Sequence, residues 1–215
     1  MAWIKELISF FLHLDRHLAD LIAQYGTGTY VILSLIVFCE TGLVVTPFLP
    51  GDSLLFAAGT FSALGGLDPW LLCACLVAAV ILGDNLNYWV GRFLGPRAFS
   101  GHYRFFKQEY LDRTHRFFVR HGGKTVVLAR YVPIVRTFTP FVAGIGAMPY
   151  PRFLAYSIGG GVTWVSLFVW AGYHFGNLPV VRRNFTLVIG AIILISVTPM
   201  LIELWRARRE RAQPA

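Results

Sequence analysis

Long apolar runs, separated by shorter charged stretches, dominate the pattern of the 215-residue chain. Three of these runs cover residues 70–90, 153–175 and 185–204, and each is close to the roughly 20 residues that a helix needs to cross a bilayer core. The pattern therefore predicts three transmembrane helices. Residues 1–26 differ, because apolar positions there recur at helical spacing among charged ones. We expect that segment to form an amphipathic helix lying in the membrane interface.

Two further apolar regions, residues 29–64 and 125–148, are interrupted by prolines and charges. Proline lacks the backbone donor of a helix and clashes with the preceding turn, so Pro133 and Pro140 are expected to break any helix between them. Irregular backbone survives at membrane depth only where protein or water satisfies it. Both regions are therefore predicted to be re-entrant hairpins, which enter the membrane and turn back.

The two interrupted regions also resemble each other. GDSLLFAAG (51–59) aligns with RTFTPFVAG (136–144) through a shared F-x-A-G ending. Further along, YWVGRFLG (88–95) aligns with VWAGYHFG (169–176) through a shared W-x-G-x-x-x-G pattern. Glycine and aromatic residues also recur by chance in membrane helices, but the recurrence of both patterns in the same order favours a duplication.

The duplication divides the chain into two repeats. Because one crossing separates the hairpins, the repeats have opposite orientations, and inverted repeats with broken helices are typical of transporters. We expect an all-α integral membrane protein of this kind. Its expected segments are an N-terminal helix (1–26), repeat 1 (27–95), a basic amphipathic segment (96–124), repeat 2 (125–176), a C-terminal transmembrane helix (185–204) and a basic tail (205–215).

Composition and charge support this class and orient the chain. It is 56% hydrophobic and only 14% charged, with a mean hydropathy of +0.59 and a net charge of +8. A soluble domain of this size carries a larger charged surface. The positive-inside rule explains the basic segments 96–124 and 205–215 better than nucleic-acid binding does, so both segments and the C-terminus are expected to be cytoplasmic. The charges of residues 1–26 nearly balance and leave the side of the N-terminus open.

Four charged residues, Glu40, Asp52, Arg130 and Arg136, lie inside the interrupted regions. A charge near the bilayer centre costs roughly 2.5–3.5 kcal/mol on insertion scales, so each needs a reason. The simplest reason is two acid–arginine ion pairs that lock the hairpins together. The alternative is function, because a guanidinium matches a phosphate with two parallel hydrogen bonds, whereas a carboxylate can take up and release protons. The arginines are therefore candidate phosphate-binding residues and the acids candidate proton-coupling residues.

Asp84, in the motif GDNLNYWVGR, is a secondary candidate together with Arg92, eight residues further on. A structural network between the two and a functional role are equally open at this point. The cysteines Cys39, Cys73 and Cys75 lie in apolar stretches and do not have the spacing of a metal site. We expect neither a metal nor a cofactor.

Taken together, the motifs resemble a known family. ETGLVVTPFLPGDSLLFAAG, GDNLNYWVGRFLG and RYVPIVRTFTPFVAGIGAMPYPRF are similar to the DedA family of bacterial inner-membrane proteins, which is related to the eukaryotic VTT-domain lipid scramblases. The resemblance implies a transporter-like fold with two opposed re-entrant hairpins. It also implies translocation of a polyprenyl phosphate, chiefly undecaprenyl phosphate, coupled to protons. The functional acids of the family fall on Glu40 and Asp52, and its functional arginines fall on Arg130 and Arg136.

Two other functions compete with lipid translocation. A proton-coupled exporter of small cations or drugs would bind its substrate through Glu40 and Asp52 and use the arginines only as counter-ions. A membrane phosphatase needs a nucleophile and a base, but no histidine lies in either hairpin, so an enzyme is not expected. The small residues of SIGGGVTW (157–164) permit close helix packing within the chain or between copies, which leaves a homo-oligomer open.

Overall fold

The computed structural model describes residues 14–43, 51–98, 130, 133–195 and 198. Every regular element within these residues is a helix, so the expected all-α fold class is confirmed for the described part of the chain. The basic segment beyond residue 98, the basic tail and the first thirteen residues lie outside it.

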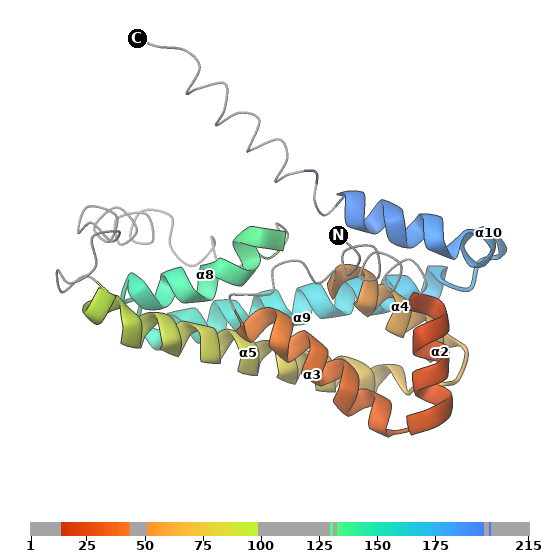
Figure 1. Ribbon diagram of the computed structural model, residues 1–215, viewed down its shortest axis with the longest axis horizontal. Coiled ribbons are helices and arrows are strands. Elements are labelled where there is room, and N and C mark those ends of the chain that lie inside the picture. Colours follow the sequence, from red (N-terminus) through yellow and green to blue (C-terminus); the bar gives the residue numbers. More distant parts are fainter. Residues whose placement is uncertain (1–13, 44–50, 99–129, 131–132, 196–197, 199–215) are drawn as a thin grey trace, which may run out of the picture.

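Two long helices form the frame of the molecule. Helices α5 (Pro69–Ala98) and α9 (Tyr150–Phe175) run antiparallel, because Trp70 packs against Trp170 at one end and Tyr88 stacks on Phe153 towards the other (Figure 1). Residues Pro69–Leu94 and Tyr150–Phe175 are the two described helices that are long and apolar enough to cross a membrane. The predicted crossing over 185–204 begins with the apolar helix Phe185–Ile195, and most of its remainder is outside the described residues.

Three shorter helices pack against this frame. They are α3 (Gly28–Gly42), α4 (Gly51–Ala63) and α8 (Pro133–Ile145). At a rise of 1.5 Å per residue each is about 20 Å long, which is shorter than the hydrocarbon core of roughly 30 Å. The segment between α3 and α4, and the first limb of the predicted hairpin over 125–148, lie outside the described residues.

The prolines of the second interrupted region do not break its helix. Pro133 is the first residue of α8 and Pro140 lies inside it, so the expectation of a broken helix between them is wrong. At the first position of a helix the missing N–H has no partner to lose. Pro140 removes only the hydrogen bond to the Arg136 carbonyl, and Asn87 Nδ2 donates to the neighbouring Thr137 carbonyl at 2.7 Å. A side chain of α5 therefore supports the turn that Pro140 weakens.

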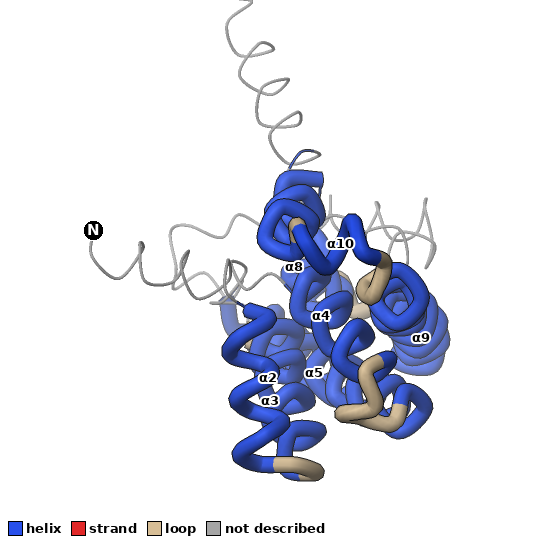
Figure 2. The backbone as a smooth tube through the Cα atoms, turned by 90° about the vertical axis from the view of Figure 1, so that its right-hand side faces the viewer, coloured by secondary structure: helices blue, strands red, loops and turns tan. Residues whose placement is uncertain are grey.

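The short helices cover the frame in a crossed arrangement. α4 packs on α9, whereas α3 and α8 pack on α5 (Figure 2). The larger hydrophobic cluster joins α3, α4 and α9 through buried side chains such as Leu33, Leu55 and Val165. A smaller cluster joins α5, α8 and α9 and includes Tyr88, Ala143 and Phe153. α4 and α8, which belong to the two interrupted regions, thus pack on different long helices.

Glycines bring the backbones together where these helices cross. A Cβ on Gly59 would overlap the Val169 carbonyl oxygen, and one on Gly172 would overlap the Phe56 carbonyl oxygen. The same pair of contacts occurs between α8 and α5. There, Gly144 faces the Tyr88 carbonyl and Gly91 faces the Phe141 carbonyl. The four glycines are those of the F-x-A-G and W-x-G motifs, so both motifs serve backbone-to-backbone packing.

Two small helices complete the described part. Helix α2 (Leu14–Tyr25) covers the second part of the predicted N-terminal helix, buries Leu18 and ends at Gly26, whose positive φ of 50° suits a glycine at a helix C-terminus. Helix α10 (Pro179–Arg183) connects α9 to the final apolar helix. Neither contributes to the charged centre described next.

Candidate functional site

Arg136 lies at the centre of a buried group of charges. It occupies the first turn of α8, and its two terminal nitrogens bind different carboxylates. Arg136 Nη2 donates to Glu40 Oε1, and Arg136 Nη1 donates to Asp52 Oδ1 at 2.7 Å. The residues are almost inaccessible, with exposed fractions of 7% for Arg136, 2% for Glu40 and 8% for Asp52. We call these three residues the Arg136 cluster.

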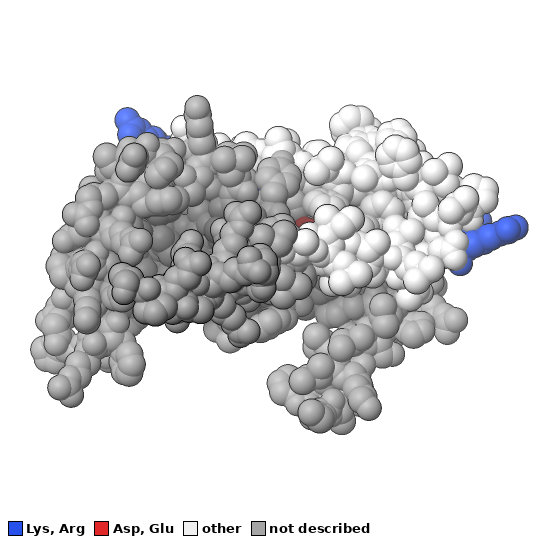
Figure 3. Space-filling view, turned by 90° about the horizontal axis from the view of Figure 1, so that it is seen from above, with Lys and Arg blue, Asp and Glu red and all other residues white. Residues whose placement is uncertain are grey.

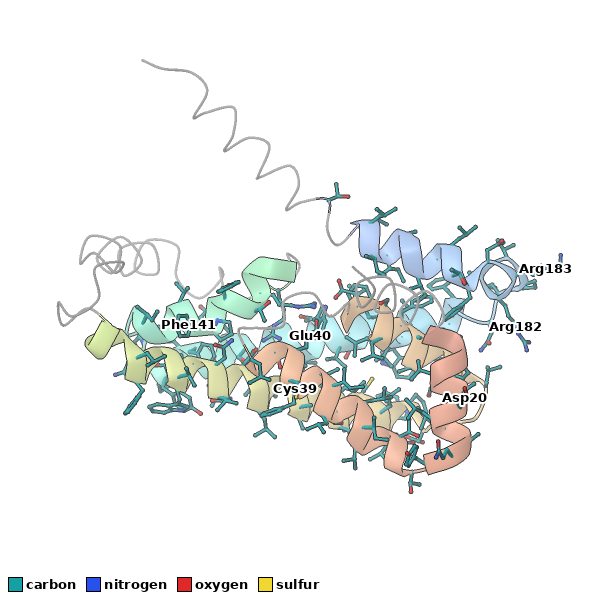
Figure 4. The ribbon with its side chains drawn as sticks, in the orientation of Figure 1. Asp20, Cys39, Glu40, Phe141, Arg182 and Arg183 are labelled. Carbon is teal, nitrogen blue, oxygen red and sulfur yellow. The ribbon has the colours of Figure 1, made fainter. Side chains whose placement is uncertain are left out.

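The ends of three short helices build this cluster. Glu40 lies in the last turn of α3, and Asp52 is the second residue of α4. Figure 4 shows Glu40 near the middle of the molecule, where the ends of α3, α4 and α8 meet. The backbone N–H of Gly51 donates to Glu40 Oε1 at 3.2 Å, so the start of α4 also holds the acid of α3. A Cβ at Gly51 would overlap the Glu40 carboxylate, so a larger residue at this position would displace that side chain.

Trp164 connects the cluster to the long helix α9. Its indole Nε1 donates to Asp52 Oδ1 at 2.8 Å, and the guanidinium carbon of Arg136 lies 4.3 Å from the ring centroid. The ring face attracts the cation while the ring N–H binds the anion. Trp164 is 1% exposed, and this fixed side chain holds both members of the Asp52–Arg136 pair in position.

The stability of the Arg136 cluster depends on the presence of each of its charged residues. Removing two opposite charges from water is costly, and losing one partner leaves an uncompensated charge that costs far more. Both terminal nitrogens of Arg136 are bonded to carboxylates, and they are the donors with which a guanidinium binds a phosphate in a fork. In this structure the acids therefore occupy the donors that an anionic ligand would use.

A second buried ion pair joins Arg130 to Asp84 of α5. Arg130 also donates to the carbonyl and hydroxyl oxygens of Ser157 in α9, at 3.3 and 3.4 Å, and the Ser157 hydroxyl donates to Asp84 Oδ2 at 2.5 Å. Their exposed fractions are 4% for Arg130, 2% for Asp84 and 0% for Ser157. We call these three residues the Arg130 cluster.

Asn87 connects the surroundings of the two clusters. It lies one turn after Asp84 on α5 and is fully buried. Its Nδ2 donates to the carbonyl of Thr41, next to Glu40, at 3.2 Å and to the carbonyl of Thr137, next to Arg136, at 2.7 Å. One amide side chain thus ties α3 and α8 to α5.

The structure brings together three of the four charges that the sequence singled out. Glu40, Asp52 and Arg136 meet, whereas Arg130 pairs with Asp84 instead. Asp84 does not pair with Arg92, whose Nη1 donates to the Tyr88 hydroxyl oxygen at 3.4 Å. Sequence reasoning did not single out three contributing residues, Asn87, Ser157 and Trp164. Only the polar character of GDNLNYW, inside an apolar run, marked Asn87 in advance.

The described residues show few charged side chains on the face drawn in Figure 3. In the view of Figure 3, Lys and Arg side chains of the described residues are visible only at the two ends of the molecule. Within the described ranges, no three His, Cys, Asp or Glu side chains are placed to hold a metal ion. Large apolar side chains such as Val31, Leu82 and Leu167 are exposed, as expected of a surface that contacts lipid.

Comparisons with known proteins place the chain in a family. The model of the VTT domain matches residues 49–174, which include α4, α5, α8 and α9. Protein DedA of Escherichia coli K12 is 52% identical over 218 residues, covering 100% of both chains. An uncharacterized membrane protein of Mycobacterium leprae is 42% identical over 182 residues, covering 84% of this chain and 82% of its own. Inner membrane protein YghB of Escherichia coli K12 is 33% identical over 199 residues, covering 92% of this chain and 90% of its own.

No solved structure matches the chain. The sequence relatives are nevertheless decisive, because identity at these levels extends over nearly the whole chain and the domain match covers more than half of it. The names of the Mycobacterium leprae protein and of YghB describe membrane proteins, in agreement with the two membrane-length helices. The chain is therefore a membrane protein of the DedA family, with a VTT domain at its centre.

Proposed function

We propose that this protein translocates a polyprenyl phosphate lipid, chiefly undecaprenyl phosphate, across the bacterial inner membrane and couples that movement to protons. The observation that carries the proposal is the Arg136 cluster, in which a buried guanidinium is held by two carboxylates at the meeting point of three short helices. Phosphate is the lipid headgroup that such a fork matches best. The apolar exterior would let the lipid tail remain in the bilayer.

The proposed binding step is an exchange of anions on Arg136. A phosphate and the carboxylates of Glu40 and Asp52 compete for the same N–H donors, so the headgroup enters as the carboxylates withdraw. The start of α4, whose Gly51 N–H now binds Glu40, would then offer a backbone donor to the phosphate. Trp164 would keep the guanidinium in position throughout, because its ring contact does not involve the N–H donors.

Protons enter the same exchange. A carboxylate that takes up a proton loses its charge and with it most of its attraction for Arg136. Proton uptake by Glu40 or Asp52 would therefore favour phosphate binding, and proton release would favour its departure. This competition supplies a physical link between the proton gradient and the lipid, with Arg136 as the group that both partners share.

The architecture that we propose for this cycle is an inverted repeat of re-entrant hairpins. The shortness of α3, α4 and α8 supports hairpins that do not cross the bilayer. The matched glycine contacts support two equivalent halves, because α4 meets α9 through the same motif positions by which α8 meets α5. In such transporters the halves rock about a site at their interface. With the basic segments inside the cell, the C-terminus is cytoplasmic.

Substitution of Arg136 by lysine tests the proposal most directly. Lysine keeps the charge but loses the planar fork, so we expect transport of polyprenyl phosphate into reconstituted vesicles to fall by about tenfold or more, equivalent to at least 1.4 kcal/mol. Arg152→Lys is the matched control, because Arg152 is exposed at the start of α9. Undiminished transport by the Arg136→Lys protein would contradict phosphate binding at this residue.

Direct binding separates lipid translocation from cation export. Purified protein is titrated with a polyprenyl phosphate and, separately, with small organic cations. Translocation requires saturable retention of the phosphate lipid that weakens in the Arg136→Lys variant. Saturable cation binding that depends on Glu40 and Asp52, without retention of the lipid, would favour the exporter instead.

A further inference from the structure

The Arg130 cluster is separate from the Arg136 cluster in both partners and position. Its acid, Asp84, lies on α5 and its hydroxyl, Ser157, on α9, so it is built on the two long helices instead of on the short ones. A buried charged side chain far from water needs a structural or functional reason. Locking two long helices together would explain the ion pair alone, but the remaining polar atoms call for more.

One hydrogen-bond donor of Arg130, its Nε, has no partner in the described part of the chain. Among the described residues five buried side-chain nitrogen or oxygen atoms have no hydrogen-bond partner, and three of them belong to the site region: Arg130 Nε, Asn87 Oδ1 and Glu40 Oε2. These residues are at least nine-tenths buried. A buried polar atom without a partner is unfavourable, and such atoms occur where a ligand or a water molecule binds.

Asn87 lies between the Arg130 cluster and the Arg136 cluster. It is one turn from Asp84, the partner of Arg130, and its Nδ2 reaches the carbonyls next to Glu40 and Arg136. The side of α5 that carries Asp84 and Asn87 therefore presents a continuous polar strip from one arginine cluster to the other. In a span that is largely apolar, this strip is the feature that a purely structural ion pair leaves unexplained.

We infer that Arg130, Asp84 and Ser157 form a second phosphate-binding station, in which a phosphate group displaces Asp84, and that Asn87 lies on the path between this station and Arg136. The inference rests on the proposed function and deepens it. Phosphate oxygens are acceptors, and the station offers donors: the Nε and terminal nitrogens of Arg130 and the Ser157 hydroxyl. Gly161 of α9 lies beside Arg130, because a Cβ there would be 3.9 Å from Arg130 Nη1.

The two stations would bind the headgroup in succession. Each has its own carboxylate competitor, so each can return to a neutralised ion pair once the phosphate leaves. A single fork made by both arginines at once is not what the structure shows, because the arginines bind different acids. The headgroup would therefore pass from one arginine to the other and displace a carboxylate at each of them.

The test measures binding to the purified full chain with farnesyl phosphate, inorganic phosphate and farnesol as probes. Asp84→Asn removes the competing charge but keeps the shape, so we expect farnesyl phosphate to bind several-fold more tightly and to raise the melting temperature more than in the unsubstituted protein. Transport of polyprenyl phosphate should slow, because release from the station is impeded. Asp20→Asn, on the exposed face of α2, is the matched control and should change neither quantity.

A second set of variants keeps the inference testable if Asp84→Asn does not fold. Arg136→Lys alone should retain weakened farnesyl phosphate binding, and the additional change Arg130→Lys should abolish it. If Arg136→Lys by itself removes all binding, or if a folded Asp84→Asn protein binds farnesyl phosphate no more tightly than the unsubstituted protein, the second station is overturned while the proposed function stands. No binding of any phosphate to the unsubstituted protein would instead overturn the proposed function.

The probes also identify the source of the phosphate. Stronger effects with farnesyl phosphate than with inorganic phosphate indicate a lipid headgroup, whereas equal effects indicate free phosphate as the ligand of the station. Equal binding of farnesol would show that the apolar chain alone is recognised, which overturns a phosphate station.

Discussion

Helices α4 and α8 have the same packing but opposite charge. Each has a glycine that contacts the backbone of a long helix, and each of those long helices returns a glycine to the short one. At their starts, however, α4 carries Asp52 whereas α8 carries Arg136, and these two residues form an ion pair with each other. The comparison teaches that the framework is shared between the two helices whereas the chemistry is divided between them.

Removal of Arg136, the cation that Glu40 and Asp52 share, should have the largest effect on stability. Arg136→Ala leaves Glu40 and Asp52 buried without their partner, which costs about 3–5 kcal/mol of unfolding free energy. Thermal and denaturant unfolding in detergent measure this loss. Arg152→Ala, an exposed change at the start of α9, should leave stability nearly unchanged. Equal stability of the two variants would show that the buried pair is not the link between α4 and α8.

Substitutions at the glycine contacts test whether the framework is equivalent in its two parts. Gly172→Ala and Gly91→Ala each push a Cβ into the carbonyl of the facing short helix, so both should destabilise by about 1–3 kcal/mol and by similar amounts. Gly159→Ala, also on α9, has open space around its Cβ and should be neutral or slightly stabilising. A large difference between Gly172→Ala and Gly91→Ala in unfolding experiments would break the equivalence of the two crossings.

Trp164→Phe should have the smallest effect. Phenylalanine keeps an aromatic face for Arg136 but cannot donate to Asp52, which retains its hydrogen bond from Arg136. The loss is therefore that of one hydrogen bond with no acceptor abandoned, about 1 kcal/mol, together with the packing lost where the smaller ring leaves space. Unfolding of Trp164→Leu, which also lacks the ring face, should show a larger loss. If the two variants behave alike, the ring contact with Arg136 contributes nothing.

The elements that hydropathy and length can define were predictable from the sequence. The two long helices lie close to the predicted segments 70–90 and 153–175, and the rarity of charge between 29 and 64 singled out Glu40 and Asp52. The F-x-A-G and W-x-G motifs were visible as repeats, but that they contact each other across the chain required coordinates. Spacing within a helix identifies neighbours three or four residues away, and it says nothing about which faces of distant helices meet.

The choice of partner for each arginine was the main feature that the sequence did not contain. Arg130 pairs with Asp84 across 46 residues, and Arg136 with Asp52 across 84. Which acid each arginine meets follows from the packing of α3, α4 and α8 on the two long helices, and the sequence does not contain that packing. Trp164 escaped notice for a related reason, because an aromatic residue in an apolar helix has no polar signature until its ring N–H meets a buried carboxylate.

The crossed seating of the short helices has a mechanical consequence. At the glycine crossings the backbone of α4 contacts that of α9, and the backbone of α8 contacts that of α5. Each short helix would therefore turn together with the long helix that it contacts. The distance between Asp52 and Arg136 would then depend on the angle at which α5 and α9 cross. A modest change in that angle would open or close the Arg136 cluster, with no need for either short helix to unwind.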